Sequence, residues 1–470
     1  MFVKKLDNVN FNNFPVAIFG TGPAGITAAL ELEKKNIKCL LIEAGDENYS
    51  KTSQAFYKGK VIGDQITDLS SNRLRQLGGT SGIWGGWSKP MEKYNFDLWP
   101  LKANDLDSYS KKACKILDIN YQFRRSSLNK FFNQIEFQYS KVRFAHKFKN
   151  HIKNSNNILL VLNTQLSHFI GHNNNTEYAV CISNKVTKRV SAKYFVLACG
   201  GIENSRILLW TREKNQGFID DGLPIGKYWM SHPWILAGVG IINKKKLKKK
   251  LENHFLEYEG PLHFAAKEEL INSKKILSAA IYMNAKEDTK IYKEIIKNIL
   301  CVAPEYGKKI AHMVSKKSLK CGNIFMHVED APNENNRIIL DKEKDELGIP
   351  SVKLFYKTSE YSLKTAKLFL EEFGNLCVKD DIGRIAIKDS IHNLEAFKIL
   401  GPTCHHMGGT RMGIDKFNSV VNKDSKVHNI NNLYVSGSSS FVTGGYTNPT
   451  YTIIQLAIRL AEKINERLHT

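Results

Sequence analysis

The fold is decided by the stretch of residues 15–45, which reads PVAIFGTGPAGITAALELEKKNIKCLLIEAG. Its first five residues, 15–19, form a short apolar run that predicts a buried strand. A glycine-rich turn follows, and residues 26–35 then have the spacing and composition of a helix. Residues 37–42 predict a second buried strand. The order strand, glycine turn, helix and strand predicts a βαβ unit of a parallel sheet.

The glycine turn has the pattern of a dinucleotide-binding site. Gly20 permits the tight turn, Gly22 lets the backbone approach a pyrophosphate, and Gly25 allows close packing of the helix on the strand. The free N–H groups at the start of the helix favour phosphate charge. Glu43 ends the second strand, where a carboxylate accepts hydrogen bonds from an adenosine ribose and repels a 2′-phosphate. These residues favour FAD or NAD over NADP.

Two more glycine-rich segments extend this domain along the chain. Residues 78–86 contain five glycines, a density that lets backbone pass close to a flat or anionic ligand. Residues 193–198 predict another buried strand, and the two glycines at 200–201 open a helix after it. The sequence therefore predicts one nucleotide-binding domain assembled from discontinuous pieces.

Length and charge bound the class of protein. The chain has 470 residues, 42% of them hydrophobic, which predicts two domains and excludes a disordered chain. Its formal net charge is +22. The run of residues 244–250 holds six lysines, and we expect it to be a solvated loop or hairpin tip, with an anionic partner surface as the alternative. No RRM, KH, zinc-finger or basic-zipper pattern occurs, so we expect no nucleic-acid partner.

Targeting and metal patterns point to a cytoplasmic protein without a metal site. The N-terminal residues lack the apolar segment of a secretory signal, and no run of about 18–20 apolar residues occurs. The eight cysteines stand singly, without a C-x-x-C pattern, and we expect them to be reduced. Peripheral contact with a membrane stays open.

The last seventy residues carry the candidate catalytic groups. His405 and His406 stand just before a Gly-Gly turn, and Asn448 and Pro449 precede a predicted helix at residues 451–467. A neutral imidazole is a natural general base, and an amide can hold a hydroxyl without competing for its proton. On these grounds His405 and His406 are both open as the base.

The chain resembles the glucose–methanol–choline (GMC) oxidoreductase family of flavoproteins, closest to its gluconate-dehydrogenase-like and pyranose-oxidase-like branch. The matching pieces run in the family's order: residues 20–25 with Glu43, 78–86, 200–206, 226–233, 406–412 and 448–452. Each piece is modest alone, and together they are specific. The resemblance implies an α/β fold (α+β overall), with a Rossmann-like FAD-binding domain and an interwoven substrate domain built on an antiparallel sheet with helices. The FAD-binding domain would comprise residues 1–100, 155–235 and 395–470, and the substrate domain residues 101–154 and 236–394.

The resemblance also implies FAD as the cofactor and assigns the site. His406 maps to the family's proton-accepting base and Asn448 to its partner, with His405 as the next candidate. The loop of residues 79–84 would lie against the flavin, residues 165–166 on the adenine side, and residues 437–438 and 448–450 near the pyrimidine end. The implied cofactor-binding residues are Gly20, Gly22, Pro23, Ala24, Gly25, Glu43, Gly78, Gly79, Thr80, Ser81, Ile83, Trp84, Gln165, Leu166, Cys199, Gly200, Asn204, Arg206, Gly437, Ser438, Asn448, Pro449 and Thr450.

One departure from the family bears on how FAD is held. Pyranose oxidases attach FAD through a histidine immediately before the tryptophan of the glycine-rich loop, and Ile83 occupies that position here. We therefore expect non-covalent FAD.

The implied reaction is oxidation of a CH–OH group of a sugar, polyol or sugar-acid-like substrate, by hydride transfer to flavin N5 with His406 as base. A dehydrogenase with an external electron acceptor is favoured over an oxidase. The alternatives are a sugar oxidase that uses O₂, and a flavin-dependent tailoring or epimerising enzyme acting on a carrier-linked or nucleotide sugar.

Overall fold

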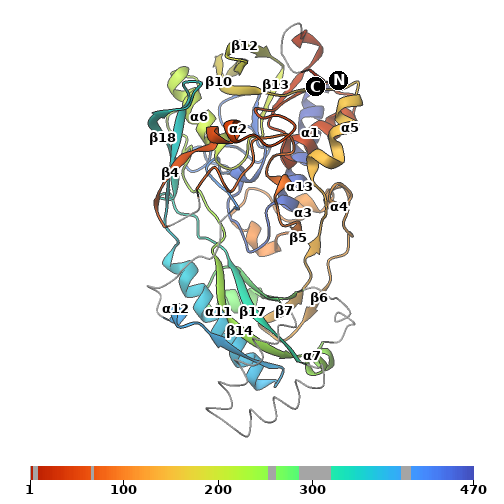
Figure 1. Ribbon diagram of the computed structural model, residues 1–470, viewed down its shortest axis with the longest axis vertical. Coiled ribbons are helices and arrows are strands. Elements are labelled where there is room, and N and C mark those ends of the chain that lie inside the picture. Colours follow the sequence, from red (N-terminus) through yellow and green to blue (C-terminus); the bar gives the residue numbers. More distant parts are fainter. Residues whose placement is uncertain (1, 4–8, 65–67, 252–260, 285–318, 393–403) are drawn as a thin grey trace.

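A parallel sheet forms the upper part of the molecule in Figure 1, a computed structural model that describes residues 2–3, 9–64, 68–251, 261–284, 319–392 and 404–470. Its strands, in spatial order, are β1 (Phe2–Val3), β9 (Ile158–Val161), β3 (Cys39–Ile42), β2 (Val16–Phe19), β13 (Tyr194–Leu197) and β21 (Leu433–Val435). Every neighbouring pair in this sheet is parallel. Strands from distant parts of the chain therefore meet in one sheet, as the discontinuous glycine motifs predicted.

The predicted βαβ unit is confirmed as β2, α1 (Pro23–Glu33) and β3. The helix begins earlier than predicted because Pro23 suits a first turn, where its missing N–H costs nothing. Gly20 has a φ of +103°, and a Cβ there would lie 2.3 Å from the carbonyl oxygen of Ala198. Only glycine therefore allows this turn beside the end of β13.

Alternating side chains of the parallel sheet face two cores. Val16 and Ile18 point into a core shared with one set of helices, whereas Ala17 and Phe19 point into a core on the opposite face. The helices of the first core are α1, α4 (Ser110–Leu117), α5 (Phe144–Asn154) and α13 (Thr450–His469). The second core lies under α6 (Glu203–Lys214) and the antiparallel sheet of β10 (Thr164–His172), β11 (Asn175–Ser183) and β12 (Val186–Ser191). The result is a layered α/β domain.

A second, antiparallel sheet occupies the lower part of Figure 1. Its order is β20 (Gly383–Ile387), β14 (Trp234–Asn243), β17 (Leu319–Val328), β16 (Ala279–Asn284), β15 (Leu262–Ala266), β7 (Phe132–Ile135) and β6 (Arg125–Ser127). One face packs on α11 (Glu360–Lys379), where Phe369 and Phe373 make ring contacts with Phe132. On the other face, His327 approaches the ring of His405, so this sheet forms one side of the candidate site.

The remaining strands and α-helices lie outside these two large sheets and their covering helices. They are the small sheet of β18 (Arg337–Lys344), β19 (Pro350–Tyr356) and β4 (Gly59–Gly63), the pair β5 (Trp87–Ser88) and β8 (Gln138–Tyr139), and the helices α2 (Lys51–Gln54), α3 (Asn104–Asp107), α7 (Lys244–Lys250), α8 (Glu268–Lys274) and α12 (Asp389–His392).

The segment of residues 101–154, expected in the substrate domain, divides between the two halves. Its strands β6 and β7 join the antiparallel sheet, while α4 and α5 pack with α1 and α13 on the parallel sheet. The reason is local amphipathicity: Ile116 and Ile152 are buried in the same core as Ile26 of α1. The two-domain division stays our proposal, with α4 and α5 on the side of the parallel sheet.

The expectation of a loop at residues 244–250 was wrong, because this run forms the helix α7. The side chain of Asn243 caps it by accepting a hydrogen bond from the backbone N–H of Lys246 at 3.2 Å, and Leu247 is buried. Lys246 pairs with Asp381 and Lys250 with Asp380. Part of the excess positive charge is thus balanced locally.

Candidate active site

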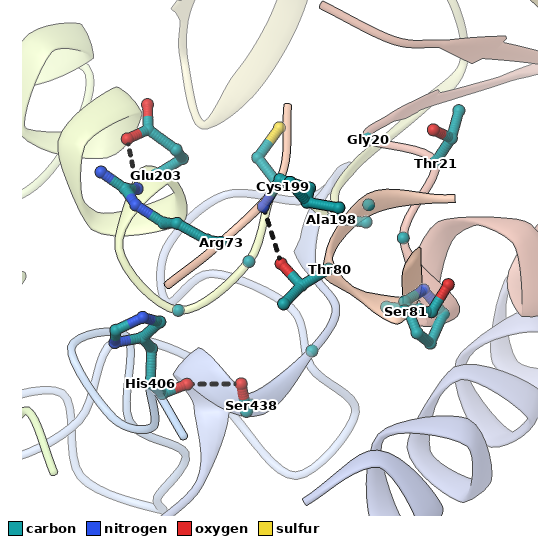
Figure 2. Close-up of a pocket in the computed structure, with 18 of the residues that line it drawn as sticks. Gly20, Thr21, Arg73, Thr80, Ser81, Ala198, Cys199, Glu203, His406 and Ser438 are labelled. Atoms are coloured by element: carbon teal, nitrogen blue, oxygen red, sulfur yellow. Dashed lines mark hydrogen bonds and ion pairs between the residues drawn. The ribbon is translucent and has the colours of Figure 1, made fainter. Parts of the chain in front are cut away.

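A pocket lies at the carboxyl ends of the parallel strands, the edge where ligands bind in open α/β sheets. Its wall is built from the turns that follow β2, β3, β13 and β21, together with the loop of residues 79–86 and the segments 404–406 and 448–450. Figure 2 shows Gly20, Thr21 and Ser81 toward one side of the view and His406 and Ser438 toward the other. Segments far apart in the chain therefore share one cavity.

At one end, the pocket has the chemistry of a dinucleotide site. α1 begins beside the pocket, and no side chain caps its first backbone N–H groups. The space next to them is open, because a Cβ on Gly22 would meet no atom within 4 Å. The Glu43 carboxylate accepts hydrogen bonds from the Thr21 hydroxyl at 2.6 Å, the Thr21 N–H at 3.0 Å and the Gly45 N–H at 2.8 Å. These donors hold Glu43 rigidly in the wall of the pocket.

Most of the residues expected to bind the cofactor line this pocket. They are Gly20, Gly22, Pro23, Ala24, Glu43, Gly79, Thr80, Ser81, Ile83, Trp84, Gln165, Leu166, Cys199, Gly200, Gly437, Ser438, Asn448, Pro449 and Thr450, together with His405 and His406.

Four of the expected residues do not line it: Gly25, Gly78, Asn204 and Arg206. Gly25 gives α1 room against the Gly20 carbonyl, and Gly78 packs against Ala145. The Asn204 amide accepts from the backbone N–H of Cys199 and donates to the Ser439 hydroxyl. These residues shape the wall from behind.

Arg206 belongs to a buried ion-pair network instead. It pairs with Glu203 at 3.1 Å and with Asp345 at 2.6 Å, and Glu203 also pairs with Arg73 at 2.7 Å, as Figure 2 shows for the latter pair. Arg73 and Glu203 both line the pocket. Sequence reasoning missed both because nothing in the local pattern relates residues 130 positions apart.

The two consecutive histidines contact different partners. His406 Nε2 lies 3.0 Å from Oδ1 of Asn72, and its ring is 5.7 Å from that of Trp229. His405 Nε2 lies 3.3 Å from Nδ2 of Asn448. The contact with Asn448 that the resemblance suggested for His406 is therefore made by His405, although both histidines line the pocket.

Burial keeps these imidazoles neutral near pH 7. It lowers the pKa of His406 to about 3, helped by the nearby charge of Arg73. It also lowers the pKa of His405 well below its usual value, with neighbouring histidines adding to the effect. A neutral ring keeps a lone pair, so each histidine can accept a proton.

The pocket fits a bound dinucleotide in one further respect. His406 Nδ1 and the Ser436 hydroxyl are buried on its wall, and neither has a hydrogen-bond partner among the described residues. Gly201 also lets two segments approach closely, because a Cβ there would lie 2.2 Å from the His406 carbonyl oxygen. The described residues contain no group of three or more His, Cys, Asp or Glu side chains able to hold a metal ion.

Comparison with known proteins matches one region of the chain to a family model. Residues 332–457, which carry His405, His406 and Asn448, match the family model for GMC oxidoreductases. Over this region the chain is similar to the GMC oxidoreductases. The cofactor of this family is FAD, which agrees with the glycine turn and Glu43.

Curated relatives and solved structures cover different shares of this chain. The fructose dehydrogenase large subunit of Gluconobacter japonicus is 26% identical over 294 residues, which are 60% of this chain and 48% of that protein. The chain spans about half the length of the curated relatives that it matches. Two solved structures, pyridoxine 4-oxidase from Mesorbium loti and an FAD-dependent oxidoreductase from Chaetomium thermophilum, superpose with TM-scores of 0.61 and 0.63 at 14% identity. They cover 97% of this chain and 99% and 100% of theirs, so the fold is shared along nearly the whole chain.

In the part of the chain that the structure describes, no helix combines the length and apolar character that crossing a membrane requires.

Proposed function

We propose that the protein oxidises a CH–OH group of a sugar, polyol or sugar-acid-like substrate. The observation that carries this proposal is that two neutral histidines and Asn448 lie on the wall of the pocket that fits FAD. The similarity to a fructose dehydrogenase subunit supports the substrate class.

Bound FAD supplies an acceptor for the two electrons and the hydrogen that leave the carbinol carbon as hydride. The histidine base takes the proton of the hydroxyl group, so the alcohol becomes a carbonyl and no atom is left over. Asn448 donates an N–H to the substrate oxygen and stabilises its developing negative charge.

Two observations support different histidines as the base. The resemblance assigns His406, whose Nδ1 is buried without a partner among the described residues. His405 is the second candidate because it contacts Asn448. We take His406 as the proposed base and compare its removal with the removal of His405.

Anaerobic stopped-flow reduction of the flavin separates the two histidines. We expect His406→Ala to retain FAD and to lose about 100-fold or more of the reduction rate, the range expected when a general base is removed. His405→Ala is the matched comparison, with bound FAD measured by absorbance in both. A normal rate in His406→Ala with a loss in His405→Ala would move the base to His405. A panel of sugars, polyols, sugar acids and nucleotide sugars identifies the substrate.

We propose a dehydrogenase that passes electrons to an external acceptor. Ile83, which replaces the linking histidine of pyranose oxidases, supports this choice. Stoichiometric hydrogen peroxide under air would identify an oxidase instead. Turnover without consumption of any acceptor would identify the tailoring or epimerising alternative.

A further inference from the structure

A chain of hydrogen bonds runs from a backbone carbonyl to Asn448. His232 Nε2 lies 3.2 Å from the carbonyl oxygen of Gly444, and His232 Nδ1 lies 2.8 Å from Nδ1 of His405. His405 Nε2 then lies 3.3 Å from Nδ2 of Asn448. Sequence reasoning gave His232 no role beyond its place in a matching segment.

Backbone pairing brings the two histidines together. Met230 and Met407 exchange both backbone hydrogen bonds, with N···O distances of 2.8 and 3.0 Å, as an antiparallel pair. Continuing that register by two residues places His232 opposite His405. A Cβ on Gly444 would lie 3.1 Å from His232 Nε2 and 2.8 Å from the end of the Met407 side chain. The site is therefore built so that the imidazole of His232 reaches the Gly444 carbonyl.

The direction of every hydrogen bond in the chain follows from its first member. A carbonyl oxygen only accepts, so His232 carries its hydrogen on Nε2 and, being neutral, a lone pair on Nδ1. His405 must then donate from Nδ1 to His232, which leaves the lone pair of His405 on Nε2. That lone pair accepts from the amino group of Asn448. The opposite arrangement would place a lone pair of His232 against the Gly444 oxygen in a buried site.

Burial supports the neutral state that this assignment requires. His232 is 2% exposed, and burial lowers its pKa to about 4. The ring of His327 stacks on that of His232 with centroids 6.2 Å apart, and it adds no positive charge because burial also lowers its own pKa, to about 3.

We propose that His232 is a positioning residue that fixes the tautomer of His405 and, through it, the orientation of the Asn448 amide. The amino group of Asn448 then faces His405 with one N–H and keeps its second N–H for the substrate oxygen. The effect of this orientation on the rate of the reaction rests on the proposed function, whereas the tautomer of His405 does not. The tautomer assigned to His405 in the resting site does not depend on whether His406 or His405 later takes the proton.

The test replaces His232 by two side chains of different hydrogen-bonding capacity. His232→Asn keeps an acceptor near the position of Nδ1, and His232→Leu removes it. Nitrogen-15 NMR of histidine-labelled holoenzyme reports which ring nitrogen carries hydrogen, and a His405→Asn sample assigns the His405 signals. We expect hydrogen on His405 Nδ1 in the wild type and in His232→Asn, and a mixture of tautomers in His232→Leu. His327→Leu is the matched control, since it removes a stacked ring outside the relay.

Flavin reduction gives the second readout. We expect His232→Leu to slow the reduction step at least about tenfold with the substrate dissociation constant nearly unchanged, and His232→Asn to recover most of the loss, since a base or donor held in the wrong tautomer loses rate rather than affinity. FAD content checks folding of each variant. Hydrogen on His405 Nε2 in the wild type, or an unchanged tautomer in His232→Leu, would overturn the proposal. Absence of flavin reduction by any alcohol would instead overturn the proposed function and leave the NMR result to decide the relay.

Discussion

At the scale of single residues, hydrogen-bond partners set the orientation of the side chains in and around the pocket. Glu43 receives three donors, and His405 lies between His232 and Asn448. The glycine turn and Glu43 are readable from sequence because their spacing within one βαβ unit is local. Which histidine meets Asn448 was not readable, because His405 and His406 are adjacent and both precede the same turn.

Ile83 gives a prediction at this scale. It lines the pocket and is 54% exposed, and an alkyl side chain cannot form a bond to the flavin. We expect FAD to separate from the protein on acid precipitation, which absorbance of the supernatant measures. Yellow colour retained by the washed, denatured pellet would show a covalent link made elsewhere on the chain.

At the scale of elements, the network of Arg73, Glu203, Arg206 and Asp345 ties the start of α6 to the turn between β18 and β19. Burial and opposite charges act together: desolvation disfavours the charge of Glu203, but the two arginines hold its pKa below its usual value. The sequence placed Arg206 beside FAD because it lies in a matching segment. Its helical position instead turns it toward Pro350, whose carbonyl accepts from it at 2.6 Å.

Removing Arg206 tests this network. Its side chain is 3% exposed, so Arg206→Ala leaves the carboxylate of Asp345 without its cationic partner, and we expect a loss of about 3–5 kcal/mol in the free energy of unfolding. Urea denaturation with FAD present measures it. Arg384→Ala is the control, because Arg384 and Asp381 form an exposed pair, and it should change stability by less than about 1 kcal/mol. Equal effects of the two variants would contradict the role of the network.

At the scale of the whole molecule, the site lies where the antiparallel sheet meets the domain of the parallel sheet. His263 and His327 come from the sheet, His232 from the segment before β14, and His405 and His406 from the C-terminal region. Burial lowers the pKa of each. These histidines therefore bind more protons in the unfolded chain than in the folded one below the ordinary histidine pKa of 6.5, and their contribution to stability falls as pH falls from about 6.5.

His263 isolates one contribution to this pH dependence. Burial lowers its pKa to about 4, and its ring packs between Phe137 and Tyr282. His263→Phe removes the titrating group and keeps an aromatic ring. We expect the variant's free energy of unfolding, relative to wild type, to rise by roughly 1–2 kcal/mol between pH 7 and pH 5. Denaturation curves at both pH values measure this, and a constant difference would contradict the assignment.

The sequence by itself determined the βαβ unit, its glycine turn, the acidic residue at the end of β3 and the pair of histidines before the Gly-Gly turn. These features depend on residues close in the chain, where spacing dictates backbone conformation. Tertiary structure alone decided that His232 contacts His405 and that Arg73 pairs with Glu203. It also decided that the lysine run forms a helix whose side chains pair with Asp380 and Asp381. For His232 and His405 the physical reason is register: one backbone pair, Met230 with Met407, sets which side chains face each other across segments far apart in sequence. For the two sets of ion pairs it is the packing of elements that the sequence pattern does not relate.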